Sequence, residues 1–334
     1  MLEHAAYPAL LILSLGLILS ACELFTNGIE WAGRRLRLSD GATGSVLAAV
    51  GTAMPETAVP IVALMAGGGG GGEVAVGAIA GAPFMLSTLV FFVTGAAVFY
   101  FSRKNGRPAT LGADPACVSR DLGFFIVIYA SAVAAAFIRA HAARLVIALC
   151  LAMSYGVYMY VTLRRGGSGQ HGMEELHVSR FFHVETKGGF ILLQVLAGLG
   201  LIVLGAHLFV EAVERVSEMM AVPAVLLSLI ITPIATELPE KFNSVLWIRK
   251  GKDTLAVGNV AGAMVFQASF PVAIGVAFTP WALTGPTMVS AVIALLSAGI
   301  CYIHIKVKKT VSPGALMAGG AFYLAFIVYL LARI

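Results

Sequence analysis

The residues best suited to bind a cation are two glutamates that end matching T-x-x-P-E motifs, Glu56 and Glu240. Thr52 and Thr236 begin the same motifs, so each copy combines a hydroxyl with a carboxylate. The proline before each glutamate cannot donate a backbone hydrogen bond, which frees a carbonyl oxygen nearby. Ca²⁺ takes about six to eight oxygen ligands, whereas zinc and copper prefer nitrogen or sulfur. The motifs therefore predict a site for Ca²⁺ or a related cation.

The second motif also contains Glu237 and, one residue beyond its end, Lys241. Their spacing, with Glu first, would let them form one buried ion pair with a structural role. Alternatively, Glu237 is a third acidic ligand or a proton carrier, and the Lys241 ammonium replaces a bound Na⁺. Three negative charges and one positive charge leave a formal charge of −2 at such a site, which one Ca²⁺ would cancel. Burial and like charges favour protonated carboxyl groups, so an empty site would take up protons.

These charged motifs lie in a very apolar chain. It has 334 residues, of which 59% are hydrophobic and 12% are charged, whereas a soluble domain has about 25% charged residues. This composition excludes a soluble enzyme. A charged side chain at the centre of a membrane helix costs about 2.5–3.5 kcal/mol, which indicates that the buried charges have a function.

With about 20 residues needed per span, the apolar runs predict an all-α membrane protein with ten transmembrane helices. We expect spans at 7–33, 42–66, 74–102, 122–139, 144–163, 189–217, 222–248, 254–278, 283–304 and 313–332. The long hydrophilic segment 164–188 divides the chain into two five-span repeats, 1–163 and 189–334.

Most of the 22 Lys and Arg residues fall in alternate connecting segments. Because such segments face the cytoplasm, 164–188 is predicted to be a cytoplasmic loop and both termini to lie outside the cytoplasm. We expect a multi-pass protein of the cell (inner) membrane, in contact with lipid and inorganic cations. The net charge of +5 is explained by topology and does not indicate nucleic-acid binding. A monomer is compatible with this sequence.

The chain contains an internal repeat. Residues 22–56 align without gaps to 206–240, and 73–86 align to 254–267. Each unit predicts a long helix, a span broken at T-x-x-P-E and a span broken at G-x-x-x-G. Five spans separate the copies, so the second is inverted in the membrane relative to the first. Inverted repeats with interrupted spans are typical of secondary transporters, whose ion site lies near the bilayer midplane.

The motif pairs GTAMPE…GAIAGAP and ATELPE…GNVAGAM resemble the α-repeats of the cation/Ca²⁺ exchanger superfamily, the sodium/calcium exchanger membrane domain. The chain looks like a divergent, prokaryotic-type member. The resemblance implies exchange of Ca²⁺ for Na⁺, K⁺ or H⁺ by alternating access. It also implies that Glu56 and Glu240 are the central carboxylates, with Thr52 and Thr236 as hydroxyl or carbonyl neighbours.

The chain departs from the family pattern where hydroxyl and amide residues help to form flanking Na⁺ sites. The departing positions are Ala53, Glu237, Ala82, Leu86, Ala263 and Gln267. Ala and Leu side chains cannot bind a cation, so the resemblance implies fewer Na⁺ ligands here. We therefore favour H⁺ over Na⁺ as the counter-ion. If Na⁺ is transported, backbone carbonyls and Gln267 would have to bind it.

The sequence thus predicts a secondary antiporter that exchanges Ca²⁺ or a related cation for H⁺ or Na⁺. It is not expected to be an enzyme or to hold a cofactor; Ca²⁺ and the counter-ion are its ligands. Two alternatives stay open, namely a cation channel of similar architecture and a divergent relative with another substrate or none. His171, His177 and His183 in the central loop allow a regulatory metal site, although a solvated loop is the expected interpretation.

Overall fold

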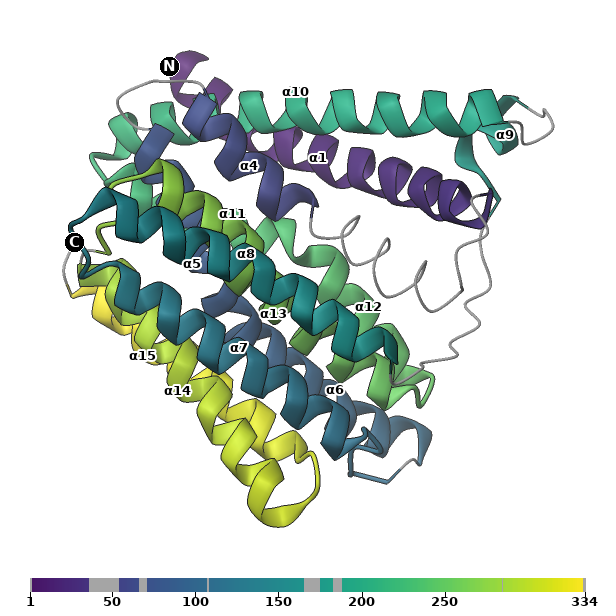
Figure 1. Ribbon diagram of the computed structural model, residues 1–334. Coiled ribbons are helices and arrows are strands. Elements are labelled where there is room, and N and C mark those ends of the chain that lie inside the picture. Colours follow the sequence, from purple (N-terminus) through teal and green to yellow (C-terminus); the bar gives the residue numbers. More distant parts are fainter. Residues whose placement is uncertain are drawn as a thin grey trace.

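The computed structural model describes residues 2–35, 54–65, 71–106, 108–164, 175–182, 188–283 and 285–332 (Figure 1). All regular structure in these ranges is helical, which confirms the predicted all-α class. The elements are α1 (Leu2–Arg35), α4 (Met54–Met65), α5 (Gly71–Met85), the π-helix η2 (Leu86–Val90), α6 (Phe91–Asn105), α7 (Pro115–Ala135), α8 (His141–Arg164), α9 (His177–Phe182), α10 (Gly188–Met220), α11 (Ala224–Thr236), α12 (Leu238–Arg249), α13 (Asp253–Phe278), α14 (Gly285–Lys308) and α15 (Pro313–Leu331).

Eight helical segments of the described chain are long and apolar enough to cross a membrane. They lie in α1, the continuous stretch Gly71–Lys104, α7, α8, α10, α13, α14 and α15. Large apolar side chains such as Leu149, Leu196 and Leu296 are exposed on them, as expected for surfaces that face lipid. The chain is therefore a multi-pass membrane protein.

The other two predicted spans are not among these eight segments. Only α4 is described within 42–66, and the span predicted at 222–248 is divided into the short helices α11 and α12. The count of ten spans accordingly stays a prediction. The start of the span predicted at 122–139 was wrong by seven residues, because Asp114 caps α7 and Pro115 occupies its first turn.

The two longest helices, α1 and α10, lie side by side along one edge of the molecule (Figure 1). They have 34 and 33 residues and come from opposite halves of the chain. Glycines allow the close approach: a Cβ added at Gly198 would lie 2.9 Å from the Phe25 Cα, and one at Gly205 would lie 2.8 Å from the Ile18 side chain. The two predicted repeats therefore pack directly against each other along these helices.

The prediction that the G-x-x-x-G motifs break their helices was wrong. α5 continues through Gly77 and Gly81, and α13 continues through Gly258 and Gly262. In α5 the glycines serve helix packing, since a Cβ at Gly77 would lie 2.5 Å from the Val225 carbonyl oxygen of α11. The irregularity comes later, where the Phe91 N–H donates to the Leu86 carbonyl in η2. Such π-helical turns are often found at functional sites.

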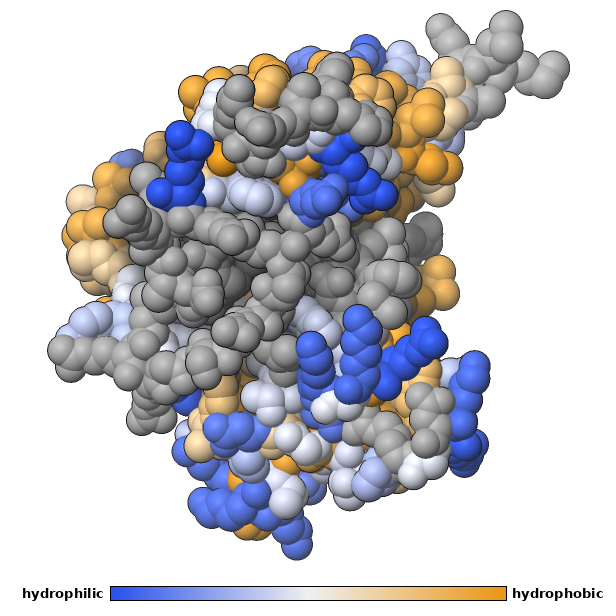
Figure 2. Space-filling view, turned by 90° about the vertical axis from the view of Figure 1, so that its right-hand side faces the viewer, coloured by the Kyte–Doolittle hydropathy of each residue, from blue (hydrophilic) through white to orange (hydrophobic). Residues whose placement is uncertain are grey.

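The connections between helices divide into two groups at opposite ends of the bundle. The described ends of the chain lie at the left of Figure 1, whereas the α6–α7, α12–α13 and α14–α15 connections lie at the right and the bottom. Termini on the same side of the membrane are expected for the even number of spans predicted from the sequence. Figure 2 looks onto the right-hand side, where hydrophilic residues gather over the lower half.

Candidate cation site

The second T-x-x-P-E motif interrupts its span at one residue, Glu237. α11 ends at Thr236 and α12 begins at Leu238, so Glu237 alone separates the two helices. Its side chain is 0% exposed. Pro239 cannot donate to the carbonyl four residues earlier, which leaves the Ala235 carbonyl without its helical donor. The break predicted from the motif is present, and a carboxylate is buried at it.

The first motif brings a second carboxylate into the interior. Glu56 lies in the first turn of α4 and is 3% exposed. The start of a helix carries partial positive charge, which stabilises a carboxylate at this position. α4 contacts α5 from its own half and α10, α11 and α13 from the other half. Glu56 is therefore buried on a helix that packs against elements of both repeats.

Gln267 on α13 is another buried residue with a polar side chain. It is 1% exposed, and neither its amide nitrogen nor its amide oxygen has a hydrogen-bond partner within the described ranges. Leaving a buried polar group unsatisfied costs about 1–3 kcal/mol. α13 contacts both α4 and α5. The side chain is thus suited to bind a ligand in the interior.

The contact between α5 and α11 holds the two halves together beside the break. The Ser228 hydroxyl donates to the Val74 carbonyl at 2.7 Å and lies 3.1 Å from the Thr232 hydroxyl. A Cβ added at Gly81 would lie 2.4 Å from the Leu229 carbonyl oxygen, so the backbones touch there. Close packing of this kind fixes α11, and with it the position of Glu237.

Lys241 lies on α12, one turn after the break. Its ammonium donates to the Pro233 carbonyl at 3.4 Å. This carbonyl also accepts a hydrogen bond from the Glu237 backbone N–H at 3.2 Å. A positive charge of the protein therefore lies next to the backbone of the interrupted span, and both interpretations of Lys241 stay predictions.

Several predicted ligands cannot be placed. Thr52 lies outside the described residues, and for Thr236 and Glu240 the structure describes the helical backbone and leaves out the side chains. Among the described side chains, no group of three or more His, Cys, Asp or Glu is arranged to hold a metal. His171 and His183 of the central loop also lie outside the described ranges, while His177 Nε2 lies 3.8 Å from Glu23 Oε1.

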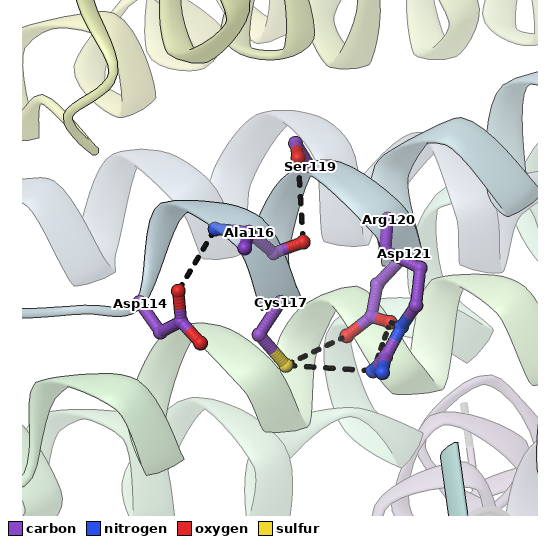
Figure 3. A network of polar contacts seen from close by, with 6 residues as sticks. All are labelled: Asp114, Ala116, Cys117, Ser119, Arg120 and Asp121. Atoms are coloured by element: carbon purple, nitrogen blue, oxygen red, sulfur yellow. Dashed lines mark hydrogen bonds and ion pairs between the residues drawn. The ribbon is translucent and has the colours of Figure 1, made fainter. Parts of the chain in front are cut away.

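A buried polar cluster at the start of α7 was not predicted from the sequence (Figure 3). The Arg120 Nε donates to Asp121 Oδ1 at 2.8 Å, and the Cys117 thiol lies 3.8 Å from Asp121 Oδ2. The Arg120 guanidinium also lies 5.9 Å from the Tyr158 ring of α8. Opposite charges on adjacent residues at the edge of an apolar run were the available signal, but the predicted span began only at 122, which left both residues in a connecting segment.

A second cluster that was not predicted joins α1, α9 and α10. The Gln194 amide donates to the Leu24 carbonyl at 2.9 Å and to the Asn27 side-chain oxygen at 2.7 Å. Its oxygen accepts from the Val178 backbone N–H at 2.8 Å. These hydrogen bonds connect the end of the central loop to the two long helices. No sequence motif predicts them.

A buried carboxylate at an interrupted membrane helix, with a second carboxylate buried at the start of α4, is typical of an ion transporter. The chain matches the family model described as sodium/calcium exchanger protein over residues 6–164 and 190–334. It therefore belongs to the sodium/calcium exchanger family, within the cation/Ca²⁺ exchanger superfamily. Members of this family are transporters, so the chain is not an enzyme.

Individual relatives support this assignment. The inner membrane protein YrbG of Escherichia coli strain K12 is 23% identical over 331 residues, which cover 96% of this chain and 95% of that protein. The putative antiporter CaxA of Alkalimonas amylolytica is 29% identical over 106 residues, which cover 30% of this chain and only 33% of CaxA.

Two solved structures share the fold. The H⁺/Ca²⁺ exchanger CAX superposes with a TM-score of 0.73 at 17% identity, covering 97% of this chain and 82% of CAX. The sodium-calcium exchanger NCX_Mj superposes with a TM-score of 0.60 at 17% identity, covering 96% of this chain and 97% of NCX_Mj. At this identity the likeness concerns the fold alone.

Proposed function

We propose that this chain is a secondary antiporter that exchanges Ca²⁺, or a related divalent cation, for H⁺ by alternating access. The observation that carries the proposal is the complete burial of Glu237 at the interruption between α11 and α12. A carboxylate at membrane depth is costly and typically marks an ion pathway. Glu56, buried at the start of α4, offers a second carboxylate from the other repeat.

The proposed Ca²⁺ ligands are the oxygens of both T-x-x-P-E motifs: Glu56, Glu240, Thr52, Thr236 and Glu237. Freed carbonyls next to the prolines complete the shell, because irregular backbone at membrane depth is tolerated only where it is buried or lines a cavity. Gln267 is proposed to add an amide oxygen from α13, which its burial without a hydrogen-bond partner among the described residues supports. The donors are all oxygens, which suits Ca²⁺ and not zinc or copper.

Protons are proposed as the counter-ion. Ala82 and Leu86, which replace hydroxyl and amide residues of the family pattern, are buried and offer no ligand for Na⁺. Protons need only acidic groups that lose them when Ca²⁺ binds. Lys241, whose ammonium already bonds the Pro233 carbonyl, provides a fixed positive charge at the interrupted span.

The deciding experiment is ⁴⁵Ca²⁺ uptake by the purified chain in proteoliposomes, under an imposed Na⁺ gradient and, separately, under a pH gradient. We expect the pH gradient to drive uptake and the Na⁺ gradient at constant pH to have little effect. Uptake driven only by Na⁺ would refute the proton proposal, and uptake without any opposing gradient would identify a channel. Empty liposomes and the Glu56→Gln variant serve as controls.

The proposed arrangement in the cell membrane has two five-span repeats, 1–163 and 189–334, a cytoplasmic loop at 164–188 and both termini outside. Single cysteines introduced at 67–72 or 279–282 into a cysteine-free variant should react with an impermeant thiol reagent added to intact cells. Cysteines at 166–186 should react only after the cells are opened. Labelling of 166–186 in intact cells would reverse the orientation.

A further inference from the structure

A groove opens on the side of the helix bundle between α7, α8 and α14. Its volume is about 1060 Å³, and it lies outside the predicted cation site. One end of the groove is charged. Arg120 near the start of α7, Lys306 in the last turn of α14 and Lys309 just after it line this end, together with one carboxylate, Asp114. The groove therefore carries an excess of positive charge where the helices end.

Two of the three cationic side chains make defined contacts. The Arg120 guanidinium is 2.7 Å from Asp121 (Figure 3). It also lies 5.9 Å from the centre of the Tyr158 ring. The Lys306 ammonium lies 5.3 Å from the Tyr302 ring, which also lines the groove. Lys309 directly follows the end of α14 and has a left-handed φ of 55°. Its backbone N–H donates to the Ile305 carbonyl at 2.9 Å. Because Asp121 already neutralises Arg120, the two lysines supply most of the positive potential.

The groove becomes apolar toward the middle of the bundle. Phe124, Val127 and Ile128 follow Arg120 on α7, and Val157 lines the groove from α8. Val127 is 67% exposed and Val157 is 54% exposed, so the apolar wall is open to the surroundings. Val127 lies seven residues after Arg120, which corresponds to about 10 Å along the helix. Along the direction in which the helices cross the membrane, the charged end of the groove is thus followed by an apolar wall.

This order matches one kind of ligand. A phospholipid in a bilayer has its phosphate at the ends of the spans and its acyl chains toward the middle. Basic pockets between transmembrane helices on the cytoplasmic side bind anionic head groups, and the positive-inside rule assigns this end of the bundle to the cytoplasm.

We propose that the groove binds one anionic phospholipid, with its phosphate at Lys306 and Lys309 and an acyl chain along Val127 and Val157. A zwitterionic phospholipid would find the same apolar wall but would gain less from the two ammonium groups. The proposal concerns lipid binding and does not depend on which ions the protein exchanges.

The test is native mass spectrometry of the full chain in detergent, titrated with phosphatidylglycerol or phosphatidylcholine of identical acyl chains. A basic residue near an anionic membrane surface is worth roughly a fivefold gain in affinity. The double variant Lys306→Gln/Lys309→Gln should therefore bind phosphatidylglycerol about 25-fold more weakly. The matched control is Lys250→Gln/Lys252→Gln, which removes two exposed charges from the α12–α13 connection and should keep wild-type affinity.

Two further measurements distinguish a bound phospholipid from a phosphate group held by charge alone. Val127→Trp fills the exposed apolar wall and keeps the lysines, so it should weaken phosphatidylglycerol binding as well. Glycerol 3-phosphate should not compete for the site. Equal binding of both lipids by the wild type, equal losses in the two double variants, or full competition by glycerol 3-phosphate would each overturn the proposal. All variants carry surface substitutions, and wild-type melting temperatures in phosphatidylcholine would establish that they fold.

Discussion

The helices α5 and α13 carry the same motif in the two repeats but differ beyond it. In α5 the helix passes into the π-helix η2 at Leu86, whereas α13 stays α-helical through the aligned residue, Gln267. Leu86 is buried among apolar side chains, while Gln267 is buried with both amide atoms unsatisfied in the described part of the chain. The two predicted repeats therefore differ in their polar groups, because Gln267, Glu237 and Lys241 all belong to the second half.

The largest expected effect concerns the residues that the repeats do share. Glu56→Gln or Glu240→Gln should reduce ⁴⁵Ca²⁺ uptake about 100-fold or more, since removing a carboxylate proposed to bind the ion costs about 3 kcal/mol of binding free energy. Folding should be nearly normal because the shape is kept. Glu73→Gln on α5 is the control, since Glu73 is exposed in the first turn. Wild-type uptake in either site variant would remove that glutamate from the proposed site.

The second prediction tests the packing role of the α5 glycines. Gly81→Ala should lower the free energy of unfolding by about 1–3 kcal/mol, because the new methyl group would meet the α11 backbone. Gly72→Ala in the same helix should be neutral or slightly stabilising, as no described atom lies within 4 Å of a Cβ at this position. Thermal unfolding of the purified variants in detergent measures both. Equal stability would show that close packing on α11 is not what these glycines provide.

Exchanging the aligned residues sharpens the comparison of the two halves. Gln267→Leu should leave stability unchanged or higher and weaken Ca²⁺-dependent stabilisation a few-fold, because it removes an unsatisfied amide that is proposed to bind the ion. Leu86→Gln should cost about 1–3 kcal/mol by burying a new polar group. Melting temperatures with and without Ca²⁺ report both effects. A strong loss of stability in Gln267→Leu would mean that the amide is structural.

The smallest expected effect concerns Lys241. Without its positive charge, the neighbouring carboxylates should hold protons more readily, so Ca²⁺ affinity should fall more steeply with decreasing pH in Lys241→Met than in the wild type. The melting temperature at neutral pH should change little. Lys241→Arg should preserve the wild-type pH profile. Identical pH profiles for Lys241→Met and the wild type would assign Lys241 a structural role.

Much of this protein was predictable from its sequence, because the relevant signals are local. Apolar runs identify membrane helices wherever they occur, since no other surface suits a bilayer. Pro239 removes a backbone donor whatever packs nearby. The interruption predicted from the motif appears at Glu237. The family assignment rested on two motifs, their order and their repetition, and the family match covers both halves.

Other features were decided only by tertiary structure, because they depend on residues far apart in the chain. The sequence shows Gly77 and Gly81 but does not show that the α11 backbone lies against them, which makes them packing residues and not helix breakers. In the sequence Gln194 does not differ from other polar residues, but in the structure its amide nitrogen lies 2.7 Å from the side-chain oxygen of Asn27, 167 positions away. Likewise, Lys306 and Arg120 border one groove only because α14 packs beside α7. Local chemistry set the class of protein and its proposed ligands, whereas packing decided which polar groups are buried and which surfaces remain open.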